Sequence, residues 1–148
     1  GKSTIGKRVA KALEREFVDT DEEIVKRINM PIAEFFKEHS ESEFRAIESE
    51  VVREVSKKSA VVIATGGGVV LAKDNVYALK RNGEIVFLDR KPENLEATKS
   101  RPLASNKDDL AKLFKKRYPI YTACADKRIV NDKSVDEIAM QIAKEFQQ

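Results

Sequence analysis

The stretch Gly1-Lys2-Ser3-Thr4, which runs directly into an amphipathic helix, decides the fold. Apolar residues recur every four positions after it and predict a helix from Lys2 to Phe17. Gly-Lys-Ser at a helix start is the tail of the phosphate-binding motif G-x-x-x-x-G-K-[ST]. An apolar strand and a glycine-rich turn precede this tail in folds that use it. We therefore expect about 10–14 further residues upstream of Gly1, a length set by that motif and its strand.

Downstream of this helix, short β-branched runs alternate with longer helical patterns, which is typical of a parallel α/β sheet. The predicted strands are Phe17–Asp19, Ala60–Ala64, Glu84–Leu88 and Lys127–Val130. The predicted helices are Glu22–Asn29, Pro31–Phe36, one that starts at Ser40 and extends past Val55, Asp74–Asn82, a short one from Pro92, Asp108–Tyr118 and one from Ser134 to Phe146. Ser40 with Glu43, and Ser134 with Glu137, have the spacing of capping boxes. Pro119 is expected to end the sixth of these helices.

Length and composition indicate one soluble domain over residues 1–148. The chain is 41% hydrophobic and 36% charged, and it has no apolar run long enough for a membrane span. A single cysteine, Cys124, excludes an internal disulfide and suits the cytoplasm. The net charge of +3 is small, Trp is absent and no basic stripe is interleaved with aromatics, so nucleic acid is not the expected partner. We expect a cytoplasmic monomer without a membrane or nucleic-acid partner.

The first candidate site is the phosphate-binding tail. A helix N-terminus offers free N–H groups and a positive dipole end to a phosphate. Lys2 would reach the β- and γ-phosphates of ATP, and the Ser3 hydroxyl would bind Mg²⁺. Taken alone, four residues before an amphipathic helix also occur by chance, and both interpretations stay open on this motif.

The second candidate is Asp19-Thr20-Asp21, at the end of a predicted strand. Carboxyl ends of parallel strands face the ligand crevice, and residues two apart on a strand point the same way. One carboxylate could therefore serve the metal and the other the acceptor hydroxyl. The alternative is that Asp21 only caps the helix expected from Glu22.

Glycines and arginines supply the remaining candidates. Gly66-Gly67-Gly68 follows the most apolar strand, and such a run is useful where the backbone must approach a ligand closely. Arg45, Arg101 and Arg117 could clamp a carboxylate or phosphate with their planar forks. Taken singly, each arginine fits a solvated surface residue better than a site residue, and Arg45 with Glu48 could be a simple helix pair. His39 and Cys124 are interpreted as a loop residue and a small packing residue.

Taken together, these motifs resemble shikimate kinase. The motifs are Gly1-Lys2-Ser3-Thr4, Phe17-Val18-Asp19-Thr20-Asp21, Phe44-Arg45-x-x-Glu48, Gly66-Gly67-Gly68, Arg101-Pro102-Leu103 and Arg117-x-Pro-x-Tyr121, in one order over nearly the whole chain. The resemblance implies a nucleoside-monophosphate-kinase-like fold with a five-stranded parallel sheet of order 2-3-1-4-5, the first strand being absent here. It also implies ATP-dependent phosphorylation of a shikimate hydroxyl, a step of aromatic amino acid biosynthesis, with Mg²⁺ as cofactor.

The resemblance also implies a role for each candidate residue. Gly1, Lys2, Ser3, Thr4 and Arg101 would bind ATP; Ser3 and Asp19 would serve the metal, Asp19 through water; Asp21, Arg45, Glu48, Gly66, Gly67, Gly68 and Arg117 would bind shikimate; and Lys2, Asp21 and Arg101 would be catalytic. Arg101 would belong to a lid spanning about residues 99–117, which would exclude water from the phosphoryl group. The preceding stretch, Glu96–Ser100, lacks the arginine often found beside adenine in this family. Two alternatives are another small-molecule kinase of this fold, such as a gluconate kinase, and a kinase-like binding module without activity.

Overall fold

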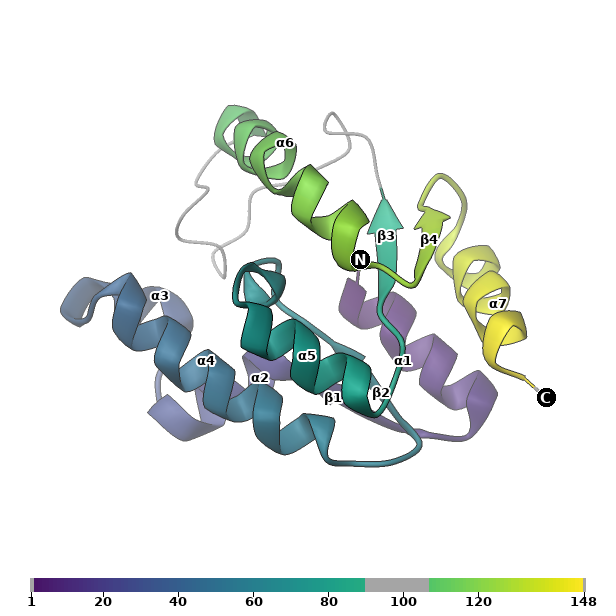
Figure 1. The fold of residues 1–148 in the computed structure, drawn as a ribbon, viewed down its shortest axis with the longest axis horizontal. Helices are drawn as coiled ribbons and strands as arrows, with labels where there is room; N and C mark the ends of the chain where they lie inside the picture. Colours follow the sequence, from purple (N-terminus) through teal and green to yellow (C-terminus); the bar gives the residue numbers. More distant parts are fainter. Residues whose placement is uncertain (1, 90–106, 148) are drawn as a thin grey trace.

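The computed structural model describes residues 2–89 and 107–147, which form parallel strands and the helices that flank them (Figure 1). In chain order the elements are α1 (Lys2–Leu13), β1 (Glu16–Asp19), α2 (Thr20–Ile28), α3 (Ile32–Glu38), α4 (Glu41–Ser56), β2 (Val61–Ala64), the 3₁₀ turn η1 (Val69–Leu71), α5 (Lys73–Arg81), β3 (Val86–Asp89), α6 (Lys107–Cys124), β4 (Lys127–Val130) and α7 (Val135–Phe146). No helix of this described part is both long and apolar enough to cross a bilayer. The short helix expected from Pro92 lies outside the described residues.

The strands form two parallel pairs. β1 pairs with β2 from Glu16↔Val61 to Asp19↔Ala64, and β3 pairs with β4 from Val86↔Lys127 to Asp89↔Val130. Within the described residues β2 and β3 are not hydrogen-bonded to each other. A cavity of about 340 Å³ lies beside both, with Val62 and Ile63 of β2 and Val86 and Leu88 of β3 in its lining. The predicted parallel arrangement, with a gap between these two strands, is confirmed, and the strand expected there stays a prediction.

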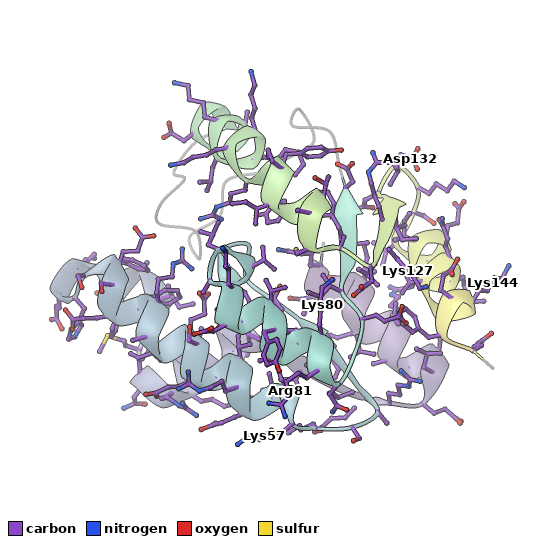
Figure 2. All side chains as sticks on the ribbon, in the orientation of Figure 1. Lys57, Lys80, Arg81, Lys127, Asp132 and Lys144 are labelled. Atoms are coloured by element: carbon purple, nitrogen blue, oxygen red, sulfur yellow. The ribbon has the colours of Figure 1, made fainter. Side chains whose placement is uncertain are left out.

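Helix α1 holds the two strand pairs together. It packs on β1 and β2 and lies alongside α7, which covers the β4 side (Figure 1). Ile5 and Val9 of α1 share a buried cluster with Ile129 of β4 and with Ile138 and Ile142 of α7. A second link is an ion pair of 3.2 Å between Lys80 at the end of α5 and Asp126 before β4; Lys80 is labelled in Figure 2. The candidate residues on α1, on β1 and in the turn after β2 are thus carried by one packed framework.

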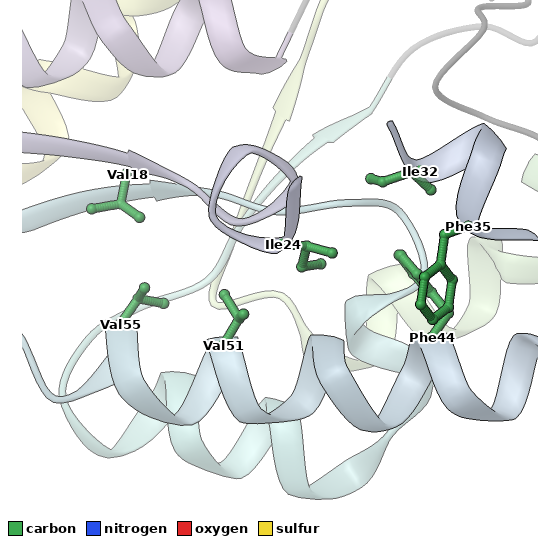
Figure 3. Close-up of a cluster of buried hydrophobic side chains, with 7 residues drawn as sticks. All are labelled: Val18, Ile24, Ile32, Phe35, Phe44, Val51 and Val55. Atoms are coloured by element: carbon green, nitrogen blue, oxygen red, sulfur yellow. The ribbon is translucent and has the colours of Figure 1, made fainter. Parts of the chain in front are cut away.

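A second buried cluster fixes α2, α3 and α4 against β1 (Figure 3). Its members are Val18, Ile24, Ile32, Phe35, Phe44, Val51 and Val55. α4 begins with the predicted capping box, in which Ser40 Oγ accepts from Glu43 N–H at 3.1 Å and Ser40 N–H donates to Glu43 Oε1 at 3.2 Å. Phe44 anchors the start of α4 in this core, so the backbone position of its neighbour Arg45 is fixed.

The first helix is shorter than its apolar spacing predicted. α1 ends at Leu13, Glu14 takes a left-handed conformation with φ of 56°, and Arg15 N–H bonds Ala10 C=O at 2.8 Å. Phe17 therefore belongs to β1, although it continues the four-residue spacing. The Phe17 ring nevertheless packs on α1 at Gly6, where an added Cβ atom would lie only 2.7 Å from a ring carbon. Phe17 therefore contacts α1 from a strand. Apolar spacing alone cannot distinguish this arrangement from a helix that continues to Phe17.

The sixth helix does not end at Pro119, contrary to the prediction. α6 continues through the proline to Cys124. A proline inside a helix costs roughly 3 kcal/mol, since it removes one backbone hydrogen bond and crowds the preceding turn. Thr122 Oγ1 donates to the carbonyls of Tyr118 and Pro119 at 3.2 and 3.1 Å, and the Tyr121 ring packs 5.2 Å from that of Phe87. Tertiary packing thus outweighs the local preference.

Candidate active site

The start of α1 meets the end of β1 through a side-chain hydrogen bond. Ser3 Oγ donates to the Asp19 carboxylate. Asp19 is the last residue of β1 and the N-cap of α2, where its Oδ1 accepts the backbone N–H groups of Asp21 at 2.9 Å and Glu22 at 3.3 Å. The carboxylate is therefore fixed by one hydroxyl and one helix N-terminus. A hydroxyl oxygen and a carboxylate oxygen are both ligands that Mg²⁺ can take.

Asp21 was predicted to continue the strand from Asp19, but it does not lie on a strand. α2 begins at Thr20, so Asp21 is in its first turn, and Asp19 rather than Asp21 is the cap. The alternation argument was wrong because the strand ends at Asp19. Asp21 nevertheless faces the glycine run, since a Cβ atom added at Gly66 would lie 2.9 Å from its Oδ1.

The glycine run occupies the turn between β2 and η1. None of Gly66, Gly67 and Gly68 has a positive φ. The turn therefore needs glycine because there is no room for a side chain, and not because the backbone is left-handed. A Cβ at Gly67 would lie 3.0 Å from Tyr121 Oη and 3.2 Å from Arg117 Nη1. A Cβ at Gly68 would lie 2.6 Å from Arg45 Cζ. Two predicted arginines therefore converge on this turn from α4 and α6.

Glu48 is the buried acid of this cluster. Its side chain is 2% exposed, and its Oε1 accepts from Arg45 Nη1 at 2.8 Å. Burial raises the pKa of Glu48, and the nearby Asp21 carboxylate adds to that rise, whereas Arg45 and Arg117 oppose it. The charges of Asp21, Arg45 and Arg117 therefore act on Glu48, although these residues lie on three different helices.

The arrangement favours an anion. Arg117 is 9% exposed, and its guanidinium borders Gly67. Each guanidinium has five N–H donors, so the bond to Glu48 leaves donors of Arg45 for a further acceptor. Two forks held at a glycine turn fit a carboxylate bidentately.

One charged cluster was missed by the sequence argument. Asp89, at the end of β3, is 7% exposed and accepts from Tyr118 Oη at 2.7 Å and from Arg128 Nε at 2.6 Å. This contact ties β3, β4 and α6 together at the carboxyl edge of the strands. A carboxylate ending a predicted parallel strand was the available signal.

Several predictions fall elsewhere. Gly1, Arg101, the stretch Glu96–Ser100 and the lid up to residue 106 lie outside the described residues; the rest of the predicted lid, 107–117, belongs to α6. His39 ends α3, stacks on Phe35 and contacts Glu43 Oε2 at 2.9 Å, in agreement with a structural role. Burial raises the pKa of the Cys124 thiol, which suits a packing residue better than a nucleophile.

The parallel α/β framework, the Gly-Lys-Ser helix start and the arginine-lined glycine turn define a P-loop kinase that acts on a small anionic molecule. The sequence profile of shikimate kinase matches residues 1–147. The chain belongs to the shikimate kinase family.

Individual relatives agree with this assignment. A shikimate kinase of Clostridium botulinum (strain Alaska E43 / Type E3) is 43% identical over 97% of this chain and 89% of its own length. One of Caldanaerobacter subterraneus subsp. tengcongensis is 38% identical over 99% and 90%. The solved shikimate kinase from Acinetobacter baumannii in complex with shikimate superposes with a TM-score of 0.92 at 32% identity, covering 99% of this chain and 86% of the other.

Proposed function

We propose that the chain transfers the γ-phosphoryl group of ATP to a hydroxyl of shikimate and so forms shikimate 3-phosphate. The observation that carries this function is the convergence of Arg45, Glu48 and Arg117 on the glycine turn beside Asp21. Shikimate is a hydroxylated carboxylate, so it offers an anion to the arginines and a hydroxyl to the aspartate. Membership of the family supports the same reaction.

The start of α1 would hold the nucleotide. Backbone N–H groups at this helix end, with Gly1 and Thr4, would bind phosphate oxygens, and Lys2 would neutralise charge on the β- and γ-phosphates. Mg²⁺ fits the donors present: the Ser3 hydroxyl would bind it directly, and the Asp19 carboxylate through water. When bound, the ion would neutralise phosphate charge during transfer.

The acceptor would lie between Asp21 and the arginine pair. Asp21, in the first turn of α2, would accept the proton of the reacting hydroxyl as general base. Arg45 and Arg117 would bind the substrate carboxylate, with the Gly66–Gly68 backbone against the ring. Glu48 would hold Arg45 in place through its 2.8 Å hydrogen bond. Arg101 would close over the phosphates as part of a lid.

A rate measurement tests this function. ADP release from ATP and Mg²⁺ is followed with shikimate, with gluconate and with no acceptor. Shikimate should stimulate release strongly and gluconate should not. Stimulation by gluconate would favour the other small-molecule kinase, and ATP binding without turnover on either acceptor would favour the inactive binding module. A monomeric state and a cytoplasmic location stay predictions for sedimentation and fractionation.

A further inference from the structure

Tyr121 contacts the glycine turn directly. Its hydroxyl donates to the Gly67 carbonyl at 2.8 Å. It lies one helical turn beyond Arg117, on the same face of α6, and both side chains border the place where Gly67 lacks a Cβ atom. The arginine and the tyrosine therefore border the turn at the same glycine.

This hydrogen bond sets the orientation of a peptide group. In a trans peptide the C=O and the following N–H point in opposite directions. Drawing the Gly67 carbonyl towards α6 therefore aims the Gly68 N–H away from α6. Within the described residues, neither the Gly67 nor the Gly68 amide donates to a protein acceptor. Backbone amides without a protein acceptor, held in a turn, are suited to an anion.

We propose that the Tyr121 hydroxyl is a positioning group for the acceptor site. It fixes the Gly67–Gly68 peptide with its amide directed away from α6, at the turn that the Arg117 guanidinium borders. The ring alone packs against Phe87, with centroids 5.2 Å apart, so removing the hydroxyl leaves the hydrophobic contact in place. This inference rests on the proposed function, because it assigns Tyr121 to binding of the same carboxylate.

The test compares Tyr121→Phe with Tyr118→Phe. Both variants remove one hydroxyl from α6, but Tyr118 donates to Asp89 instead of the glycine turn. Tyr121→Phe should raise the KM for shikimate about 3- to 10-fold, as expected for one neutral hydrogen bond. Its kcat and its KM for ATP should change little. Tyr118→Phe should leave the KM for shikimate unchanged, because its hydroxyl bonds Asp89 and not the glycine turn. A purely structural hydroxyl would lower Tm in both variants without a selective rise in this KM in Tyr121→Phe.

Two further readouts isolate the mechanism. Arg117→Lys and Tyr121→Phe should be less than additive in their effect on KM, since they disturb one contact. The chain has six glycines, so glycine-selective ¹⁵N labelling gives a simple spectrum. Shikimate should shift the Gly67 and Gly68 amide signals in the wild type, and less so in Tyr121→Phe.

Each outcome decides the proposal. If wild-type protein neither binds shikimate nor turns it over, the proposed function fails, and this inference fails with it. If the wild type is active and Tyr121→Phe has an unchanged KM for shikimate, only the role of Tyr121 is refuted. Equal increases in Tyr118→Phe and Tyr121→Phe would also refute it, because placement of α6 as a whole would then explain the effect.

Discussion

Replacing Gly68 by alanine tests whether the glycine turn exists to make room for Arg45. The new Cβ would lie 2.6 Å from Arg45 Cζ, and closer still to Nη1. Carbon atoms in ordinary contact are about 3.5–4.0 Å apart, so the guanidinium must retreat by about 1 Å. Gly68 has φ of −93° and ψ of −3°, in the bridge region that alanine can also adopt. The flexible arginine should move, and the backbone should stay.

The magnitude follows from the bond that is lost. Retreat by about 1 Å would break the 2.8 Å hydrogen bond from Arg45 Nη1 to Glu48 and misplace the fork. A hydrogen bond to a charged group contributes about 1.5–3 kcal/mol, which corresponds to roughly 10–150-fold in affinity. The KM for shikimate should rise by that factor. The KM for ATP should not rise, because the proposed phosphate site is at the start of α1, away from this turn.

Steady-state kinetics with Gly83→Ala as control provide the assay. A Cβ at Gly83 would meet only the Leu79 carbonyl, at an ordinary 3.6 Å. Gly83→Ala should therefore leave both KM values unchanged. Adding Gly68→Ala to an Arg45→Ala background should cause little further loss, since the clashing group is gone. A wild-type KM for shikimate in Gly68→Ala, or full additivity with Arg45→Ala, would refute the reasoning.

Three further predictions concern charged residues. Asp21→Asn should keep the fold and lower kcat about 10²–10⁴-fold, the usual loss for a general base; near wild-type turnover would leave Asp21 a helix residue only. Glu48→Gln should raise the KM for shikimate and make this KM less dependent on pH. The reason is that the pKa of wild-type Glu48 lies above its ordinary value of 4.5, and the protonated side chain holds Arg45 less well. Wild-type stability should also fall as pH rises through this window, since the folded state binds the proton more tightly than the unfolded chain, and urea titrations of the variant should lack that fall. Arg117→Lys should raise the KM for shikimate, whereas Arg101→Ala should mainly depress kcat; calorimetry showing shikimate binding lost only in Arg101→Ala would reverse the two roles.

The sequence by itself determined the class of fold and the candidate set. Apolar runs separated by helical patterns indicate parallel strands, and the gap between the Val62 and Val86 strands followed from the phosphate-binding tail at Gly1. Arg45, Glu48 and Arg117 were named from motif spacing, and the structure brings them to one turn. These features are local in sequence or belong to family-specific patterns, so they can be read without coordinates.

Only the tertiary structure decided which residues meet and where helices end. Pro119 sits within α6 because Tyr121 is anchored on Phe87 and Gly67, contacts made across more than thirty residues of chain that no local rule contains. Asp19 rather than Asp21 caps α2 because β1 ends at its pairing with Ala64. The glycine turn needs space for side chains from α2, α4 and α6, and such space is a property of packing between elements. Sequence periodicity describes one element at a time, so it cannot specify these contacts.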